Sequence, residues 1–201
     1  MAVYNAIKYN HDFAGTAGNL FPLATTSISS GTANVTFNSG IDSTFKEYFF
    51  IWNNIHVSTN GESTFGFQGT TDGSNYNVSM NTTMIANYNN EANNSQGMIY
   101  YTGGDQANGT ATQIFNSGGG GSDNDQCVCG WLHLFNPADT THIKHFTSVS
   151  CNYQDSDYIN FDRMTGYFNT TSAVTGIRFL PGRVYASTNL DDGVVQMFGV
   201  K

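Results

Sequence analysis

The sequence predicts an all-β fold, most simply an antiparallel β-sandwich of jelly-roll type. Aromatic and β-branched residues occur in short runs, and none of these runs shows a helix-period apolar stripe. Turns rich in Asn, Gly and Asp separate the runs at regular intervals. Aromatic residues make up 14% of the chain and charged residues only 11%, and there are 22 glycines. This composition is typical of short strands joined by many turns, and the spread of aromatic residues along the chain argues against disorder.

The chain length predicts one domain with a short N-terminal extension. A single all-β domain of 201 residues buries roughly 70% of its unfolded surface, so its stability requires neither a metal nor a disulfide. We interpret residues 1–26 as an N-terminal arm or edge strand, and residues 27–201 as a single β-sandwich domain. Within the arm, residues 1–19 contain only isolated apolar side chains and are expected to dock on a neighbouring subunit.

Residues 47–57 form the densest aromatic run of the chain, Glu-Tyr-Phe-Phe-Ile-Trp-Asn-Asn-Ile-His-Val. In an extended chain Tyr48, Phe50 and Trp52 fall on one face, and the apolar side chains between them fall on the other. A strand that is apolar on both faces is expected to be covered on both. We therefore predict a core strand, with a second sheet on one side and another sheet or subunit on the other.

The remaining strands follow from alternating apolar residues between turn signals. The Gly-rich segment 117–125 predicts a mobile surface loop within the domain. The further strands are expected at residues 27–37, 63–69, 76–80, 84–88, 97–101, 112–115, 126–135, 142–153, 166–169, 174–180 and 194–200.

The charge distribution argues against nucleic acid and membrane as partners. The formal net charge is −8, and the seven Lys and Arg residues are scattered along the chain without a basic patch. No apolar run reaches the ~20 residues that span a bilayer. The N-terminal residues lack the apolar region of a signal peptide, and three cysteines do not make a disulfide framework. We expect synthesis in a reducing cytosol.

The three cysteines raise the question of a metal or redox site. Pairing Phe135 with Ile143 across the intervening turn sets Cys127 opposite Cys151, which predicts a cross-strand cysteine pair that forms a disulfide under oxidising conditions. Zinc is a weaker alternative, because Cys127 and Cys129 are spaced as Cys-x-Cys and the nearby histidines lie at the other end of the hairpin. Small apolar residues on a packed face are the simplest interpretation. We predict no metal and no cofactor.

The Asp-rich segments 123–125, 155–157 and 191–193 leave two interpretations open. Carboxylate and amide oxygens suit calcium, but no segment completes a known calcium loop. Asp and Asn are also the ordinary residues of turns, and we favour structural turns.

No local signature of catalysis is present. The chain has neither a Gly-x-Ser-x-Gly elbow nor a phosphate-binding loop. The two catalytic carboxylates of a glycosidase can be distant in sequence, so the sequence alone does not reveal them. A hydrolase of surface polysaccharide therefore stays a hypothesis, behind the two given below. We predict that the protein is not an enzyme.

Six tyrosines in turn-rich stretches are candidates for a ligand or interface surface. Aromatic rings beside Asn, Gly and Asp suit sugar stacking, and they also suit protein interfaces. Both interpretations stay open at this point. The six are Tyr76, Tyr88, Tyr100, Tyr101, Tyr153 and Tyr158.

Several stretches resemble small β-rich virion structural proteins of tailed bacteriophages, of the marine and cyanobacterial type, described as tail-fibre-like or head-decoration proteins. One stretch is Gly-Tyr-Phe-Asn-Thr-Thr at 166–171, which continues to residue 179. The others are residues 41–48, 54–56, 136–141, 144–146 and 197–201. The resemblance covers roughly residues 27–201. Its motifs are structural, and neither the glycine run nor the Cys127–Cys129 pair belongs to them.

The resemblance implies a non-catalytic virion protein, either a capsid decoration or a small tail appendage. We expect a homotrimer on the virion surface that contacts other virion proteins and is assembled in the host cytoplasm. The alternative is a carbohydrate-binding or host-receptor recognition module, with a host surface glycan as the partner in host attachment.

Overall fold

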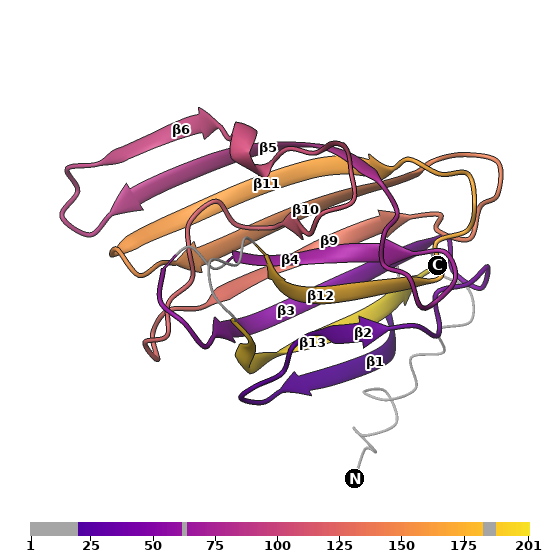
Figure 1. Ribbon diagram of the computed structural model, residues 1–201, viewed down its shortest axis with the longest axis horizontal. Helices are drawn as coiled ribbons and strands as arrows, with labels where there is room; N and C mark the ends of the chain where they lie inside the picture. Colours follow the sequence, from indigo (N-terminus) through magenta and orange to yellow (C-terminus); the bar gives the residue numbers. More distant parts are fainter. Residues whose placement is uncertain (1–19, 62–63, 183–187) are drawn as a thin grey trace, which may run out of the picture.

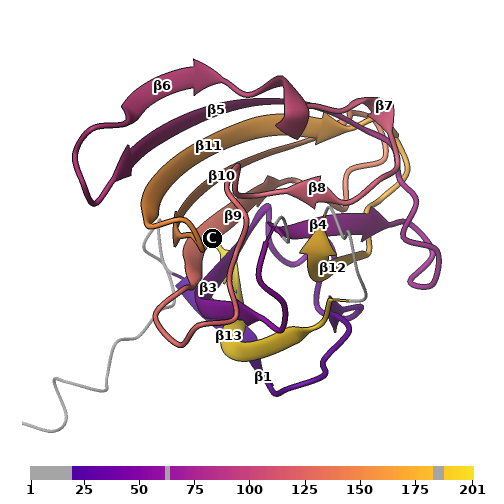
Figure 2. The same ribbon diagram turned by 60° about the vertical axis from the view of Figure 1, so that its left-hand side comes forward.

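Two antiparallel sheets packed face to face make up the protein (Figures 1 and 2). The computed structural model describes residues 20–61, 64–182 and 188–201. In this part of the chain every strand pair is antiparallel, and the only helical element is the short 3-10 turn η1 (Thr102–Gly104). The all-β antiparallel sandwich is therefore confirmed. The jelly-roll connectivity stays a prediction.

The two sheets differ greatly in size, with nine strands in one and four in the other. The large sheet has the order β1 (Leu20–Ile28), β13 (Leu190–Val200), β3 (Glu47–Val57), β9 (Val128–Phe135), β10 (Lys144–Tyr153), β11 (Tyr158–Phe168), β5 (Met80–Asn90) and β6 (Gln96–Tyr100), with β7 (Ala107–Gly109) also paired to β5. The small sheet has the order β2 (Val35–Phe37), β12 (Gly176–Gly182), β4 (Thr64–Thr70) and β8 (Gln113–Ile114). The β11–β5–β6 end of the large sheet extends beyond the small sheet (Figures 1 and 2).

Strand β3 has the bounds that the sequence predicts, and its two faces meet different surroundings. Tyr48, Phe50 and Trp52 are fully buried between the sheets, so this aromatic face fills the sandwich core as one alternative predicted. Phe49 and Ile51 point to the opposite side of the large sheet and are only half-buried.

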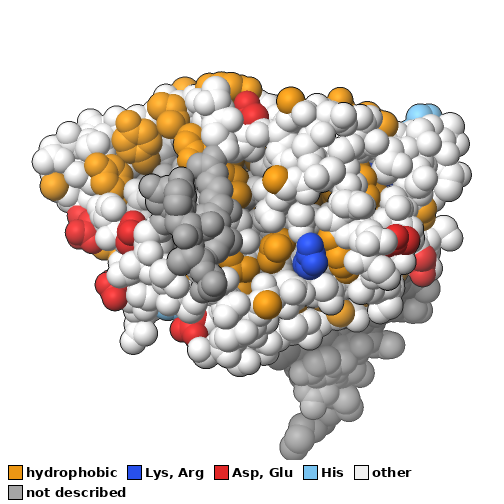
Figure 3. Space-filling model, in the orientation of Figure 1, with side chains coloured by type: hydrophobic (Ala, Val, Ile, Leu, Met, Phe, Trp, Pro, Cys, Tyr) orange, Lys and Arg blue, Asp and Glu red, His pale blue; other side chains and the backbone are white. Residues whose placement is uncertain are grey.

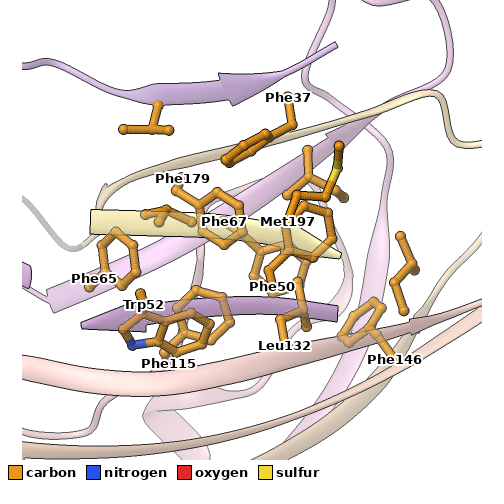
Figure 4. Packing of buried hydrophobic residues seen from close by; sticks show 14 of the residues in the cluster. Phe37, Phe50, Trp52, Phe65, Phe67, Phe115, Leu132, Phe146, Phe179 and Met197 are labelled. Carbon is orange, nitrogen blue, oxygen red and sulfur yellow. The ribbon is translucent and has the colours of Figure 1, made fainter. Parts of the chain in front are cut away.

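Aromatic rings from both sheets interlock in the core (Figure 4). Trp52 of the large sheet packs against Phe115 at 4.2 Å and against Phe65 at 5.5 Å between ring centroids. Phe179 of the small sheet contacts both Phe50 and Phe65. Full burial of each such side chain stabilises the fold by about 1.5–3 kcal/mol.

The strand predicted at 27–37 is wrong, because the chain turns in the middle of it. Gly31 adopts a φ of 87°, which favours glycine, and Thr32 bridges to Leu190. The segment therefore contributes its first part to β1 and its last part to β2, in different sheets. Residues 20–26 lie in edge strand β1, and residues 1–19 fall outside the described part of the chain.

Strand β11 is much longer than the predicted 166–169. It runs from Tyr158 to Phe168 and pairs along its whole length with β10 and β5. Conversely, the strand predicted at 76–80 is absent from the described structure, since β5 begins only at Met80. Residues 158–165 of β11 were not predicted as a strand, and they carry exposed side chains of the candidate interaction face.

Candidate interaction face and polar pocket

The binary pattern of the large sheet is inverted at its β10–β11 end. Cross-strand partners share a face, so the row Trp52, Gly130, Ser150, Asp162, Ala86 and Ile99 belongs to the inner face, toward the small sheet. The row Ile51, Trp131, Val149, Arg163, Ile85 and Tyr100 belongs to the opposite face, which we call the outer face. In the second half of β10 and the first half of β11, polar residues such as Ser150 and Asp162 therefore point inward, while Ile159 and Phe161 point outward. Elsewhere on these strands Phe146, Met164 and Phe168 point into the core.

The outer face carries exposed apolar side chains on several strands, with Asn and Thr residues between them. Ile159 and Phe161 of β11 are exposed, as are Ile85 of β5 and Met98 of β6. Farther along, the rings of Phe49 and Trp131 stack at 5.2 Å and the latter is half-buried. The face of an antiparallel sheet that contacts water is normally polar. Exposed apolar side chains gathered on such a face mark an interaction site.

Few charges interrupt the outer face. The Arg163 guanidinium lies over the Phe161 ring at 5.1 Å, so its charge is partly matched by the ring. Glu47 accepts a hydrogen bond from His133 at 2.7 Å at the far end of the face. A partner of this face would therefore be held by apolar and aromatic contacts.

The inward-pointing polar groups form a buried network around Asp162. Its carboxylate accepts hydrogen bonds from the Ser117 backbone N–H at 3.0 Å and from the Ser117 hydroxyl at 2.8 Å. Asn160 donates to the same hydroxyl oxygen at 3.0 Å. Burial raises the pKa of Asp162 to about 6, although the two bonds from Ser117 oppose this shift.

The glycine run covers this network. Side chains at Gly118 and Gly121 would collide with the Gln154 and Gln126 amides respectively, so glycine permits the backbone to approach them. Gly120 and Gly121 are buried. The run is therefore packed against the sandwich along part of its length, in contrast to the predicted surface loop.

A polar pocket of about 440 Å³ opens beside the glycine run. It combines one aromatic ring with hydroxyl, amide and carboxylate groups, the combination that suits a polyhydroxylated ligand. Nearby, Thr64 Oγ1 and Asn160 Oδ1 are buried without a hydrogen-bond partner among the described residues, which is typical of sites occupied by ordered water. The pocket is lined by Gly61, Thr64, Tyr101, Ser117, Gly118, Gly119, Gln154, Asp155 and Ser156.

The six predicted tyrosines do not form one surface. Tyr100 and Tyr153 belong to the outer face, since they pair with Ile85 and Ile159. Tyr101 lines the polar pocket.

The other three tyrosines lie elsewhere. Tyr88 and Tyr158 point to the inner side of the extended sheet end, with ring centroids 6.0 Å apart. Tyr76 lies in the loop before β5, and the Arg178 guanidinium lies over its ring, 4.4 Å from the ring centroid. Only Tyr100, Tyr101 and Tyr153 thus belong to the two candidate surfaces.

The cysteine register predicted from the sequence is wrong by two residues. Cys151 pairs with Cys129, whereas the sequence placed Cys127 opposite it. The cause is the turn between β9 and β10, where the Asp139 carboxylate accepts hydrogen bonds from the Thr141 and His142 N–H groups and lengthens the loop. All three cysteines are free thiols, and burial raises the pKa of Cys127 and of Cys151.

The described residues bring no three His, Cys, Asp or Glu side chains together as metal ligands. The ring of His56 contacts the Asp123 carbonyl oxygen at 2.8 Å and the Asp191 carboxylate at 3.6 Å. In the Asp-rich turns, Asp192 accepts a hydrogen bond from the Gly193 N–H and Asp157 accepts one from the Tyr153 hydroxyl. These carboxylates thus bond to their own chain.

Comparisons with protein families, with curated proteins and with solved structures found no match. In the described part of the chain, no helix has the length and apolar character needed to cross a membrane. The functional assignment therefore rests on the two surfaces described above.

The sequence predicted only parts of the two surfaces, namely Tyr100, Tyr101 and Tyr153 and a partner for the second face of residues 47–57. Ile159 and Phe161 alternate with Asn160 and Asp162, and this alternation is typical of a strand. The strand was not predicted because charged residues lie within and beside this segment. The pocket residues come from four separate segments and carry no local signal.

Proposed function

We propose that the protein is a non-catalytic structural subunit of a bacteriophage particle, located on the virion surface as a capsid decoration or a small tail appendage. The observation that carries the proposal is the apolar outer face of the large sheet. A chain that places Ile159 and Phe161 outward and Asp162 inward has its outer face adapted to a protein partner.

The composition of the chain fits such a role. With only 11% charged residues, electrostatic repulsion between copies is weak, and broad contacts between subunits are favoured. On an assembled lattice, each subunit would make modest contacts that are multiplied by avidity. The resemblance of residues 27–201 to phage virion proteins supports the particle as the setting and a homotrimer as the assembly.

Quantitative mass spectrometry of purified phage particles from the source tests this proposal. We expect the protein among the structural components of the particle. A copy number close to that of the major capsid protein would identify a decoration, and a number far below it would identify a tail appendage. Absence of the protein from purified particles would contradict the proposal.

The polar pocket supports a second candidate function, recognition of a host surface glycan. Tyr101 contributes an aromatic ring to the lining, while Gln154 and Asp155 contribute amide and carboxylate groups of the kind that bond sugar hydroxyls. This function is compatible with a tail appendage and would take precedence if the protein were absent from particles.

A further inference from the structure

Strand β6 forms an unprotected edge of the large sheet. Proteins usually protect such edges with proline, charge, a bulge or a very short strand. The opposite edge, β1, contains Pro22 and a register shift between Pro22 and Ala24, and the small sheet ends in strands of only three and two residues. Strand β6, Gln-Gly-Met-Ile-Tyr, has neither proline nor charge.

Apolar side chains of β6 are exposed on both of its faces. Met98 and Tyr100, on the outer face, are 74% and 60% exposed, and Ile99, on the inner face, is 40% exposed. Hydrophobic side chains also gather over the β5–β6 end in the view from the small sheet (Figure 3). A partner that covered only one face would leave part of this strand in water, whereas an added strand would extend both faces.

Among the described residues, no strand pairs with the second side of the β6 backbone. The Asn90 N–H donates to the Ser95 carbonyl, and the Tyr101 N–H donates to the Met84 carbonyl. Hydrogen bonding alternates along an antiparallel strand, so Gly97 and Ile99 also bond to β5. The N–H and C=O groups of the remaining three residues, Gln96, Met98 and Tyr100, point away from β5.

We propose that β6 pairs with β6 of a second copy of this chain, antiparallel and about a two-fold axis at Met98. In this register Met98 lies opposite Met98 of the second copy, and Gln96 lies opposite Tyr100. Each of these three residues then donates one backbone hydrogen bond and accepts one. The two large sheets join into one continuous sheet.

The side chains are self-complementary in this register. On the inner face Ile99 lies opposite Gly97 of the second copy, where the Tyr88 ring of that copy covers the glycine and offers the isoleucine an aromatic surface. On the outer face the two Met98 side chains meet, and methionine adapts its shape to such contacts. Because β6 carries no charge, the two-fold arrangement sets no like charges opposite each other, and nothing in the strand selects a partner of opposite charge.

The contact is small, since β6 has only five residues. We therefore expect a weak, concentration-dependent association rather than a permanent dimer. The contact is a property of the purified chain and does not depend on the particle proposed above. For a single chain the contact doubles the mass, and an assembly joined through the outer face, which carries one β6 edge per subunit, gains at least a doubling.

Charge reversal at the two-fold axis tests the proposal. We would measure mass against concentration by analytical ultracentrifugation for the wild type, Met98→Lys, Met98→Glu and an equimolar mixture of the two variants. The side chain of Met98 is largely exposed and its N–H points away from β5, so neither substitution removes a β5–β6 bond. The control is Thr25→Lys, an exposed position on the other edge strand, β1.

As concentration rises, the wild type and Thr25→Lys should at least double in mass, each Met98 variant alone should keep its low-concentration mass, and the mixture should associate as the wild type does. A wild type that keeps one mass throughout, or Met98 variants that associate like the wild type, would overturn the proposal. So would a mixture that shows no recovery. Unchanged circular dichroism of each variant confirms that it is folded.

Discussion

Asp162 is an acidic residue on the inner face of the sheet, and its burial has a measurable consequence. The pKa of its carboxyl is raised to about 6 in the folded protein, mainly by burial. In the unfolded chain the pKa returns to near 3.8. The folded protein therefore binds more protons than the unfolded chain between these two values, and stability must fall as pH rises through this window.

We expect the free energy of unfolding to decrease by about 3 kcal/mol from this group as the pH rises from near 4 to near 6. Asp162→Asn removes the titrating group, so the variant should lose this decrease. The measurement is urea denaturation at a series of pH values for both proteins. Parallel pH profiles for the variant and the wild type would contradict the assignment.

Other carboxylates act in the opposite direction at lower pH. Hydrogen bonds from the His142 and Thr141 backbone hold the pKa of Asp139 at about 2. Because this pKa is depressed, the stabilisation by Asp139 is lost only as pH falls below the unfolded value of 3.8. The two effects occupy separate pH windows, so the Asp162 decrease can be measured alone.

The cysteine register shows the limit of sequence reasoning for single residues. The predicted strand at 126–135 correctly included Cys129, which lies in β9. The partner of Cys151, however, depends on how many residues the β9–β10 turn uses. The Asp139 bonds that fix that number become visible only in the folded loop.

Among the strands, composition predicted β3 well and β11 poorly. The bounds of β3 follow from its run of aromatic and β-branched residues, which favour a strand. The sequence predicted cover on both faces, and in the single chain one face is buried and the other half-buried. Strand β11 mixes Asp162 and Arg163 with Ile159 and Phe161, so its first part resembled a loop. Its strand character comes from pairing with β10 and β5 on both sides.

Lys144, at the start of β10, connects two loops at one end of the sandwich. It is fully buried, and its ammonium group donates to the carbonyl oxygens of His142 at 2.6 Å, Thr171 at 2.9 Å and Thr170 at 3.2 Å. Burial lowers the pKa of this lysine. The three bonds hold the β9–β10 loop against the segment that follows β11.

Lys144→Met would keep most of the side-chain volume but leave the three carbonyl groups without this donor. We expect a loss of about 3 kcal/mol in the free energy of unfolding, measured by urea denaturation. The exposed Lys46 provides the matched control, and Lys46→Met should change stability by less than about 0.5 kcal/mol. Equal effects of the two substitutions would show that the Lys144 bonds contribute little.

On the scale of the whole molecule, the sequence predicted a sandwich. It also predicted that a sheet or subunit covers the second face of strand β3. It did not predict that the large sheet outgrows the small one, because sheet order depends on pairings between residues far apart in the chain. The inverted pattern on β10 and β11 follows from that difference. Where the small sheet ends, the inner face is covered by the glycine run and by polar groups, and the apolar residues lie on the outer face.

Cys151 is a natural probe for the central claim that the outer face is covered in the assembled protein. It is exposed in the free chain and lies on the outer face between Cys129 and Phe161. We would alkylate the free protein and purified particles at mildly alkaline pH, since burial raises the pKa of this thiol. Peptide mass spectrometry then gives the modified fraction of Cys151, and acetylation of the exposed Lys46 serves as an accessibility control.

The account predicts that Cys151 is modified in the free protein and protected in the particle, while Lys46 reacts in both. Equal modification of Cys151 in the two states would contradict it, because the outer face would then remain open to solvent after assembly.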